Sequence, residues 1–319
     1  MGLALIRFAR GAHAAWGALE GEVIVTPAGW QGWTTGALMA LPLDELTAAL
    51  EDPRCERVPL DQVSLLSPIT PNQQLIFQMG NYHSHLREVG VRDTHAARNV
   101  FFAKAASSLA PPRGQVRQPE AVALLDYEVE LGLVMGGSLT APTDIAAGEL
   151  HRYVRAVTLV NDISARDAQI ADAQYYLGKS HRGFCPVGPW LMVLEKAEFD
   201  QLEHLRLRLW VNGTLRQDAN TSDMVHRPHV SLSQLSRAID LNPGDLLATG
   251  TPGGCAIRAP RIGVQKLLNL LPDRVKLAGF VRAQLRSGRY LKAGDVITAS
   301  ITTADGRSWS GEQRTEVVA

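Results

Sequence analysis

Cysteine is scarce in this sequence. Only three cysteines occur in 319 residues, Cys55, Cys185 and Cys255, and no C-x-x-C spacing is present. An odd number of widely separated cysteines predicts neither a disulfide framework nor a zinc site with cysteine ligands. Free thiols persist in reducing compartments, so we expect a cytoplasmic protein.

Net charge and long apolar runs are also missing. Lysine plus arginine and aspartate plus glutamate both number 32, so the formal net charge is zero. A surface that binds nucleic acid or an anionic membrane needs a basic excess, so neither partner is expected. There is no apolar run of about 18 residues, and Arg7 and Arg10 interrupt the apolar start, so we expect neither a transmembrane helix nor a signal peptide.

A regular alternation of strands and helices is absent. Strand-like runs such as 99–105, 154–164 and 205–213 outnumber segments with helical spacing, of which 36–51 and 165–180 are the clearest. This pattern favours a mostly β chain with some helix (α+β), folded as a β-sandwich or roll, over a doubly wound sheet.

Two prolines in "PITPNQQ", 68–74, mark a candidate boundary. We therefore interpret 1–70 as a small N-terminal β-rich domain and 71–319 as the main domain.

The most informative segment is "DYEVELGLVMG", 126–136, in which Asp126, Glu128 and Glu130 stand two apart in an apolar run. Side chains at i and i+2 of a strand point to the same face, so these carboxylates repel unless something compensates them. Hard oxygen ligands suit Mg²⁺, Mn²⁺ or Ca²⁺ rather than Zn²⁺. Asp162, at the end of a predicted strand, is a candidate third ligand. The alternative is a solvated strand face without an ion.

Six segments carry a resemblance to a known family. They are "GNYHSHLREVG" (80–90), "FFAK" (101–104), "LDYEVELGLVMG" (125–136), "VNDISARD" (160–167), "GKSHRGFCPVGPW" (178–190) and "LLATGTPGG" (246–254). In order and spacing they resemble the fumarylacetoacetate hydrolase family, in its branch of acylpyruvases and 2-hydroxyhepta-2,4-diene-1,7-dioate isomerases. The resemblance implies that family's β-sandwich or roll catalytic domain and a homodimer.

The resemblance also implies a metal site. Glu128, Glu130 and Asp162 match the family's three ligands, which hold Mg²⁺ or Mn²⁺, with Ca²⁺ as an alternative. Gln78 stands where some members have a fourth carboxylate, so three protein ligands are expected. Asp126 is expected to support these ligands rather than to bind the ion.

His85 and Glu88 match the family's catalytic pair. Three-residue spacing on a helical turn places both side chains on one face. A carboxylate beside an imidazole fixes its tautomer and raises its basicity, as a general base requires. His83 is a rival for the same role, and an ordinary surface turn is the alternative interpretation.

Several further residues match positions around the family's substrate. Lys179 is assigned a catalytic role in stabilising negative charge. Lys104 and Thr251, with Tyr82 and Gly250 beside them in their motifs, are assigned to substrate binding. A surface lysine and a simple turn are the alternatives for Lys104 and Thr251.

Two pairs of residues in these motifs have other interpretations. Arg166 and Asp167 are interpreted as a structural, internal ion pair. His181 and Arg182 replace the aromatic–acid pair that is common in the family, and this replacement bears on the identity of the substrate.

An apparent helical insertion occupies about 257–290. We expect it to pack on the domain or at a subunit interface. Arg258 or Arg261 is a candidate to cover the substrate pocket.

The resemblance predicts a metal-dependent hydrolase that cleaves a C–C bond in a small β-diketo acid, such as an acylpyruvate or fumarylpyruvate. Water activated by His85 and Glu88 would attack a keto carbonyl, and an enolate stabilised by the metal would leave. The first alternative is an isomerase or decarboxylase of an unsaturated oxo diacid with the same site. The second is a family member that binds small acids without turnover.

Overall fold

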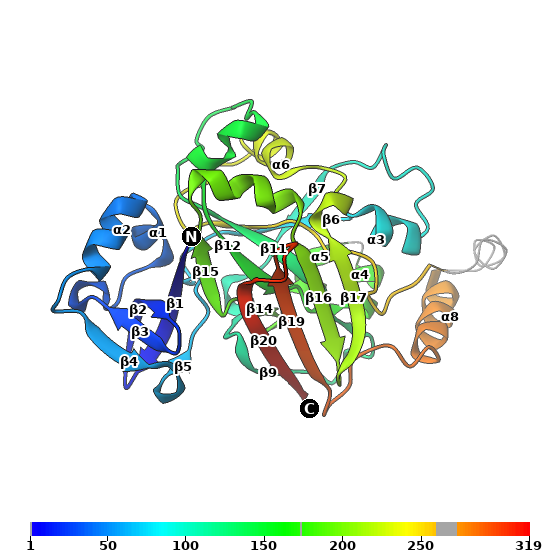
Figure 1. Ribbon diagram of the computed structural model, residues 1–319. Coiled ribbons are helices and arrows are strands. Elements are labelled where there is room, and N and C mark those ends of the chain that lie inside the picture. The colour runs from blue at the N-terminus through cyan, green and yellow to red at the C-terminus, as the bar shows by residue number, and fades with distance from the viewer. Residues whose placement is uncertain (1, 173, 260–272) are drawn as a thin grey trace.

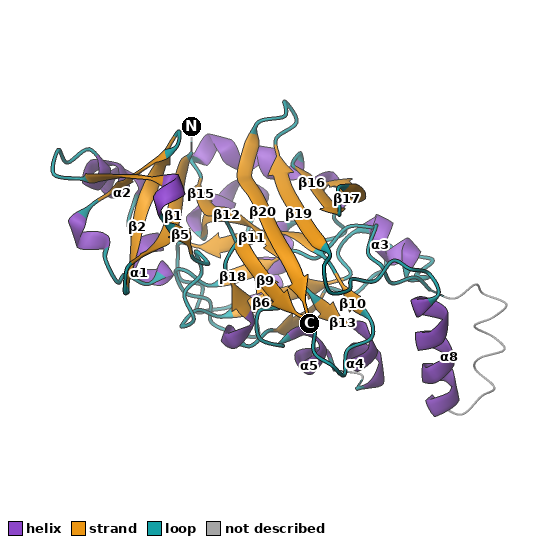
Figure 2. Cartoon of the chain, turned by 90° about the horizontal axis from the view of Figure 1, so that it is seen from below, coloured by secondary structure: helices purple, strands orange, loops and turns teal. Residues whose placement is uncertain are grey.

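The computed structural model describes residues 2–172, 174–259 and 273–319. Two large sheets dominate the molecule, as expected for an α+β chain rich in strands (Figure 1). The N-terminal strands lie at one end of the molecule, and the helix of the 257–290 segment lies at the opposite end (Figures 1 and 2). No helix among the described residues is long and apolar enough to cross a membrane.

The larger sheet contains the N-terminal strands together with strands of the main domain as far as residue 248. In spatial order they are β4 (Glu56–Pro59), β3 (Val23–Thr26), β2 (His13–Glu20), β1 (Leu3–Arg10), β15 (Trp190–Val193), β12 (Val154–Asn161), β11 (Val129–Met135), β18 (Leu246–Ala248), β6 (Leu75–Met79) and β7 (Val100–Ala103), with β5 (Ser64–Leu65) paired to β1. Because β1 pairs with β15, the N-terminal strands continue the sheet of the main domain. The boundary near residue 70 stays a prediction.

The second sheet is formed mainly by two hairpins. Its order is β17 (Thr214–Asn220), β16 (Arg206–Val211), β19 (Val296–Thr302), β20 (Ser308–Val318) and β9 (Arg113–Arg117). Asn212 and Gly213 form the first turn with φ angles of 51° and 74°, the left-handed conformation that such turns require. Two short pairs complete the strands: β10 (Leu125–Asp126) with β13 (Ser164–Ala165), and β8 (Leu109–Ala110) with β14 (Cys185–Pro186).

An apolar core joins the two sheets. Leu131 of β11 and Leu159 of β12 pack in one cluster with Leu207 and Leu209 of β16. Strand β16 alternates buried and more exposed residues, as expected for a sheet with one face in the core. Strand β11 is buried along its whole length, because a second core that includes Val134 covers its other face. This face-to-face packing is a β-sandwich.

Helices are short and lie at the margins of the sheets. They are α1 (Thr35–Met39), α2 (Leu43–Leu50), α3 (His83–Glu88), α4 (Arg166–Ala171), α5 (Tyr175–Lys179), α6 (Pro228–Leu235) and α8 (Asp273–Leu285). The single helix expected over 36–51 is wrong: Pro42, which has no backbone N–H, separates α1 from α2. The helix expected over 165–180 is likewise divided, because α4 ends at Ala171.

The pairing of the central strands brings four chain segments to one edge of the sheet. Val129 at the start of β11 pairs with Asn161 at the end of β12, since the two strands are antiparallel. Strand β18 is antiparallel to β11 and parallel to β6, so the segments that follow β18 and β6 emerge at the same edge. The candidate residues near 80–88, 128–130, 162 and 250–251 therefore meet there.

Candidate metal and substrate site

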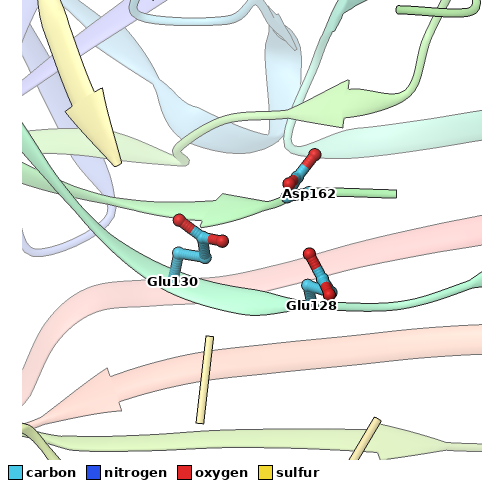
Figure 3. A group of neighbouring side chains, drawn as sticks. All are labelled: Glu128, Glu130 and Asp162. Carbon is cyan, nitrogen blue, oxygen red and sulfur yellow. The ribbon is translucent and has the colours of Figure 1, made fainter. Parts of the chain in front are cut away.

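Three buried carboxylates converge at this edge. Glu128 immediately precedes β11, Glu130 is the second residue of that strand, and Asp162 follows β12 (Figure 3). One ligand atom from each lies within 4.8 Å of the others. The backbone N–H of Asp162 donates to the carbonyl of Glu128 at 2.8 Å, which fixes the two segments side by side. We call Glu128, Glu130 and Asp162 the acidic triad.

Three cations compensate part of the negative charge of the triad. Lys179 Nζ donates to Glu128 Oε2 and Asp162 Oδ2, both at 2.5 Å. Lys104 Nζ donates to Asp162 Oδ1 at 2.6 Å, and Arg166 pairs with Glu128. Burial alone would raise the pKa of Glu128, but Arg166 and Lys179 offset burial, so the pKa lies below its usual value. The Glu128 carboxylate is therefore ionised.

Glu130 differs from the other two members of the triad. In the part of the chain that the structure describes, it forms no ion pair, and its carboxylate accepts a hydrogen bond only from the backbone N–H of Gly250, at 2.9 Å. Burial first, and then the charges of Asp162 and Glu128, hold the pKa of Glu130 well above its usual value. A divalent cation among the three carboxylates would supply the missing positive charge. The donor set of carboxylate oxygens suits a hard ion such as Mg²⁺ or Mn²⁺.

The triad opens into a cavity of about 500 Å³. His85, Lys179, Arg166 and Thr251 also line it. Its remaining walls are mainly apolar. Such a volume is appropriate for a small organic acid beside a metal ion.

His85 is the candidate base in this cavity. It is the third residue of α3, its side chain is buried, and its Nδ1 has no hydrogen-bond partner among the described residues. Burial lowers the pKa of His85 from 6.5 to about 4, so the imidazole is neutral near pH 7. The rival His83 does not line the cavity; its Nδ1 bonds to Thr94 Oγ1 at 2.8 Å, and its ring packs against His95.

The structure does not bring Glu88 to His85, so the expected pair is not formed here. The Glu88 carboxylate instead accepts hydrogen bonds from Arg258 Nη1 at 2.9 Å and from the backbone N–H of Gly254 at 2.8 Å. The carbonyl of Glu88 also accepts from the N–H of Ala259. Both residues lie in α3, but a charged partner far along the chain determines where the Glu88 side chain points. Glu88 thus ties α3 to the 253–259 segment.

Lys104 and Tyr82, which are assigned to substrate binding from the sequence, do not line the cavity. Besides Asp162, Lys104 Nζ donates to the carbonyl of Phe184 at 2.7 Å and that of Ile163 at 3.4 Å, and its side chain is fully buried. Tyr82 is fully buried as well, and neither residue lines the cavity. Lys104 holds Asp162 in position, whereas Tyr82 belongs to the core.

Replacing Lys104 by methionine is expected to destabilise the metal-free protein by about 3–5 kcal/mol, because Asp162 would lose a buried partner and two carbonyls would lose a donor. Urea unfolding of the chelator-treated protein measures this loss. Lys292→Met, at an exposed lysine, is the control and should change the unfolding free energy little. A mild effect of Lys104→Met on stability with a large increase in KM would instead support the original substrate-binding assignment.

Thr251 and Gly250 lie beside the triad. The Thr251 hydroxyl donates to the carbonyl of Val129 at 3.0 Å and accepts from Gln217 Nε2 at 2.9 Å. Thr251 lines the cavity, whereas Gly250 does not. Gly250 has φ +85°, and a Cβ there would lie 3.0 Å from Asn81 Cβ and Gln78 O. Gly250 therefore holds Glu130 through its N–H, and its assignment to substrate binding stays a prediction.

Arg166 is the cavity residue that sequence reasoning underrated. It does form internal ion pairs, but with Asp126 and Glu128 rather than with Asp167, which accepts from the N–H of Ala123. Asp126 binds Arg166 Nε at 2.9 Å and is not part of the triad, as expected for a supporting residue. The position of Arg166 four residues after Asp162, just beyond the strand predicted over 154–164, was the available signal.

Gln217 was also missed. It is fully buried in β17, and its amide links the N–H of Val129 to the Thr251 hydroxyl. Nothing in its local sequence distinguishes it from an ordinary strand residue.

The positions at which the sequence departs from the family differ in their relation to the cavity: Gln78 lines it, whereas His181 and Arg182 do not. Gln78 lines the cavity, but its amide donates to Asn99 and Ser231 rather than joining the triad. His181 packs on Phe184 and, like Arg182, does not line the cavity.

The insertion at about 257–290 packs on the domain, because α8 contacts α4 and Arg258 pairs with Glu88. The end of α8 also bonds to the start of the insertion. Gln284 bonds to both the N–H and the carbonyl of Arg258, at 3.3 and 2.8 Å. Arg258 binds Glu88 and does not line the cavity. The other candidate, Arg261, lies outside the described residues.

Comparisons of the sequence identify relatives. Residues 74–318 match the family described as Fumarylacetoacetate (FAA) hydrolase C-terminal. Protein Rv2993c of Mycobacterium tuberculosis is 38% identical over 196 residues, which are 61% of this chain and 71% of that protein. A protein of Staphylococcus saprophyticus is 36% identical over 200 residues, 62% of this chain and 64% of that protein, so the match spans slightly less than two thirds of that relative.

Solved structures resemble this one over nearly the whole chain. A fumarylacetoacetate hydrolase from Exiguobacterium antarcticum has a TM-score of 0.76 at 26% identity, over 99% of both chains. A maleylpyruvate hydrolase from Sphingobium sp. SYK-6 gives 0.71 at 26% identity, again over 99% of both chains. A 2-hydroxyhepta-2,4-diene-1,7-dioate isomerase from Mycobacterium marinum gives 0.68 at 25%, over 99% of this chain and 98% of that one. The sequence match over residues 74–318, together with this fold, shows that the chain belongs to the fumarylacetoacetate hydrolase family.

Proposed function

We propose that this protein is a divalent-metal-dependent hydrolase that cleaves a carbon–carbon bond in a small 2,4-dioxo acid, an acylpyruvate. Water adds to the C4 carbonyl, the C3–C4 bond breaks, and the products are a carboxylic acid and pyruvate. The observation that carries this proposal is the presence of a buried, neutral imidazole in the same cavity as the acidic triad.

The residues that line the cavity have distinct roles in this reaction. When bound to the acidic triad, Mg²⁺ or Mn²⁺ supplies Lewis-acid polarisation of the substrate's 2-oxo and carboxylate oxygens. Lys179 Nζ provides positive charge at the same place and stabilises negative charge that develops on these oxygens. The backbone N–H of Thr251 forms no hydrogen bond within the described residues and lies at the cavity, so it is available to the substrate carboxylate.

His85 is the proposed general base. Its neutral ring takes a proton from water, and the water oxygen attacks C4. As the C3–C4 bond breaks, its electron pair remains on C3 and gives the enolate of pyruvate. The protonated His85 then returns its proton to C3, which balances the reaction. In this scheme Glu88 acts on His85 only by fixing α3 to the 253–259 segment.

An isomerase or decarboxylase is the second candidate, and one observation favours it. Water activation benefits from a carboxylate that orients the base, but the Glu88 carboxylate binds Arg258 and Gly254 instead. Isomerisation needs only a group that moves a proton between carbons, which His85 can also perform. Binding of small acids without turnover is a third outcome.

An assay on metal-stripped protein separates these candidates. Acetylpyruvate, oxaloacetate and a 2-hydroxyhepta-2,4-diene-1,7-dioate are each incubated before and after Mn²⁺ is restored. Equal amounts of acetate and pyruvate that form only with Mn²⁺ support the hydrolase. Release of CO₂ or isomerisation of the diacid, without cleavage of acetylpyruvate, would replace it.

The pH dependence of kcat/KM should show an unusually acidic limb. Because burial lowers the pKa of His85 from 6.5 to about 4, the free enzyme keeps its base neutral as the pH falls through 6.5. We expect kcat/KM for acetylpyruvate to stay level from neutral pH down to about 5 and to fall only near the lowered pKa. Stopped-flow assays can sample this range. A limb centred near pH 6.5 would contradict the assignment.

A further inference from the structure

We propose that the cavity wall beyond the acidic triad is a subsite for an uncharged, apolar substituent at C4, so that the protein prefers acylpyruvates with alkyl or aryl tails to those with a second carboxylate. This inference rests on the proposed function and specifies its substrate. This wall, which we call the tail subsite, is formed by Phe102, Tyr175, Val91 and Ile170.

Both cationic side chains that line the cavity already bind neighbouring side chains. Among the described residues, Lys179 and Arg166 are the lysine and arginine side chains that line the cavity. Lys179 binds two carboxylates of the triad at 2.5 Å. Arg166 binds Asp126 through Nε and Gln169 through Nη1, both at 2.9 Å, and pairs with Glu128 through Nη2. Both cations are committed to neighbouring side chains, so neither is free to bind a distal carboxylate.

Two further buried or half-buried cations close to the site, Lys104 and Arg258, are also engaged. Lys104 donates to Asp162 and two carbonyls, and Arg258 is paired with Glu88. Among the described residues, a second carboxylate on the substrate would thus find no free counter-ion in this partly enclosed cavity. The loss of water from an unpaired charge is strongly unfavourable.

Apolar side chains line the cavity beyond the triad. The Phe102 ring lies close to the triad, because its centroid is 5.3 Å from Nζ of Lys179, which binds Glu128 and Asp162. Tyr175 extends the surface, with its ring centroid 5.7 Å from that of Phe102. Val91, after α3, and Ile170, in α4, line the same cavity, and 39% of Ile170 is exposed. A tail that leaves the triad along Phe102 therefore meets hydrocarbon from three separate chain segments.

Burial of hydrocarbon predicts a graded effect of tail length. Each added methylene should tighten binding roughly three- to fourfold until the subsite is filled. A terminal carboxylate of the same size should weaken binding by more than roughly 100-fold, because it gains no partner.

The test compares two substrates that differ at one end. Butanoylpyruvate ends in a propyl group, and succinylpyruvate replaces its terminal methyl by a carboxylate. Calorimetry measures the affinity of each for Mn²⁺-loaded His85→Ala protein, in which hydrolysis does not interfere. A preference for butanoylpyruvate of more than roughly 100-fold, with tighter binding along the acetyl, propanoyl and butanoyl series, is expected. Equal affinity or a preference for succinylpyruvate would overturn the inference.

Cleavage of acetylpyruvate by the wild-type protein tests the proposed function separately, because its methyl tail is too short to report on the tail subsite. If acetylpyruvate is cleaved and succinylpyruvate binds better, the tail subsite is wrong and the hydrolase stands. If acetylpyruvate is not cleaved, the affinity ratio in His85→Ala still decides the tail subsite.

A substitution at Ile170 tests whether the tail subsite causes the preference for an apolar tail. Ile170→Arg places a cation on the partly exposed α4 side of the cavity and should shift the affinity ratio toward succinylpyruvate by at least tenfold. Ile170→Met changes shape but not charge and should leave the ratio within about threefold. An unchanged ratio in Ile170→Arg would overturn the placement of the tail at Ile170.

Discussion

His85→Ala is expected to lower kcat/KM for acetylpyruvate by roughly 100- to 10,000-fold, the usual effect of removing a general base. The reason is that the neutral imidazole is the proposed proton acceptor in the cavity and no second histidine lines it among the described residues. Mn²⁺ affinity should remain near that of the wild type, because His85 is not a member of the acidic triad. Steady-state kinetics and calorimetry measure the two quantities.

Glu88→Gln is the matched comparison for His85→Ala. Glutamine keeps the size of Glu88 and can still accept from the N–H of Gly254, but it loses the charged contact with Arg258. If Glu88 acts by fixing α3, kcat should fall much less in Glu88→Gln than in His85→Ala. Equal losses in both variants would mean that Glu88 turns to His85 during turnover and would restore the pair expected from the sequence.

Glu130→Gln and Glu128→Gln are expected to have the same effect on metal binding and different effects on stability. Each removes a ligand of the acidic triad, so Mn²⁺ affinity should fall by more than roughly 100-fold. In metal-free protein, Glu130→Gln removes a buried carboxylate that has no cationic partner in the described chain, so the unfolding free energy should stay the same or rise. Glu128→Gln leaves the charges of Arg166 and Lys179 buried with fewer partners and should cost about 3–5 kcal/mol.

Calorimetry with Mn²⁺ and urea unfolding of chelator-treated protein provide both readouts. The contrast between the two variants is the informative result, because both replacements have the same size and lie two residues apart. If Glu130→Gln destabilised the metal-free protein as much as Glu128→Gln does, this would contradict the view that the charge of Glu130 is uncompensated. Wild-type affinity for Mn²⁺ in either variant would remove that residue from the metal site.

The strand chemistry of the site could be predicted from local sequence. Glu128 and Glu130 stand at i and i+2, which places them on one face of a strand wherever that strand lies. The turns at Asn212-Gly213 and Asp305-Gly306 follow from Asn212, Gly213 and Gly306, which have positive φ angles. These features depend on neighbours within a few residues, so the sequence contains them directly.

The partners of the charged residues could not be predicted in the same way. Lys104 meets Asp162 across 58 residues, and Glu88 meets Arg258 across 170. The spacing of His85 and Glu88 allowed a pair on one face of α3. In the structure the Glu88 carboxylate instead binds the Arg258 guanidinium and the backbone N–H of Gly254. Long-range packing therefore decides which of several locally allowed contacts each charged side chain makes.

The central claim is that the acidic triad binds a divalent cation within the substrate cavity. Anomalous diffraction from crystals grown with millimolar Mn²⁺ tests it most directly. The account predicts one strong peak within about 2.5 Å of an oxygen from each of Glu128, Glu130 and Asp162, and no such peak in Glu130→Gln crystals. A wild-type crystal without a peak at the triad, or with Mn²⁺ bound only elsewhere, would contradict it.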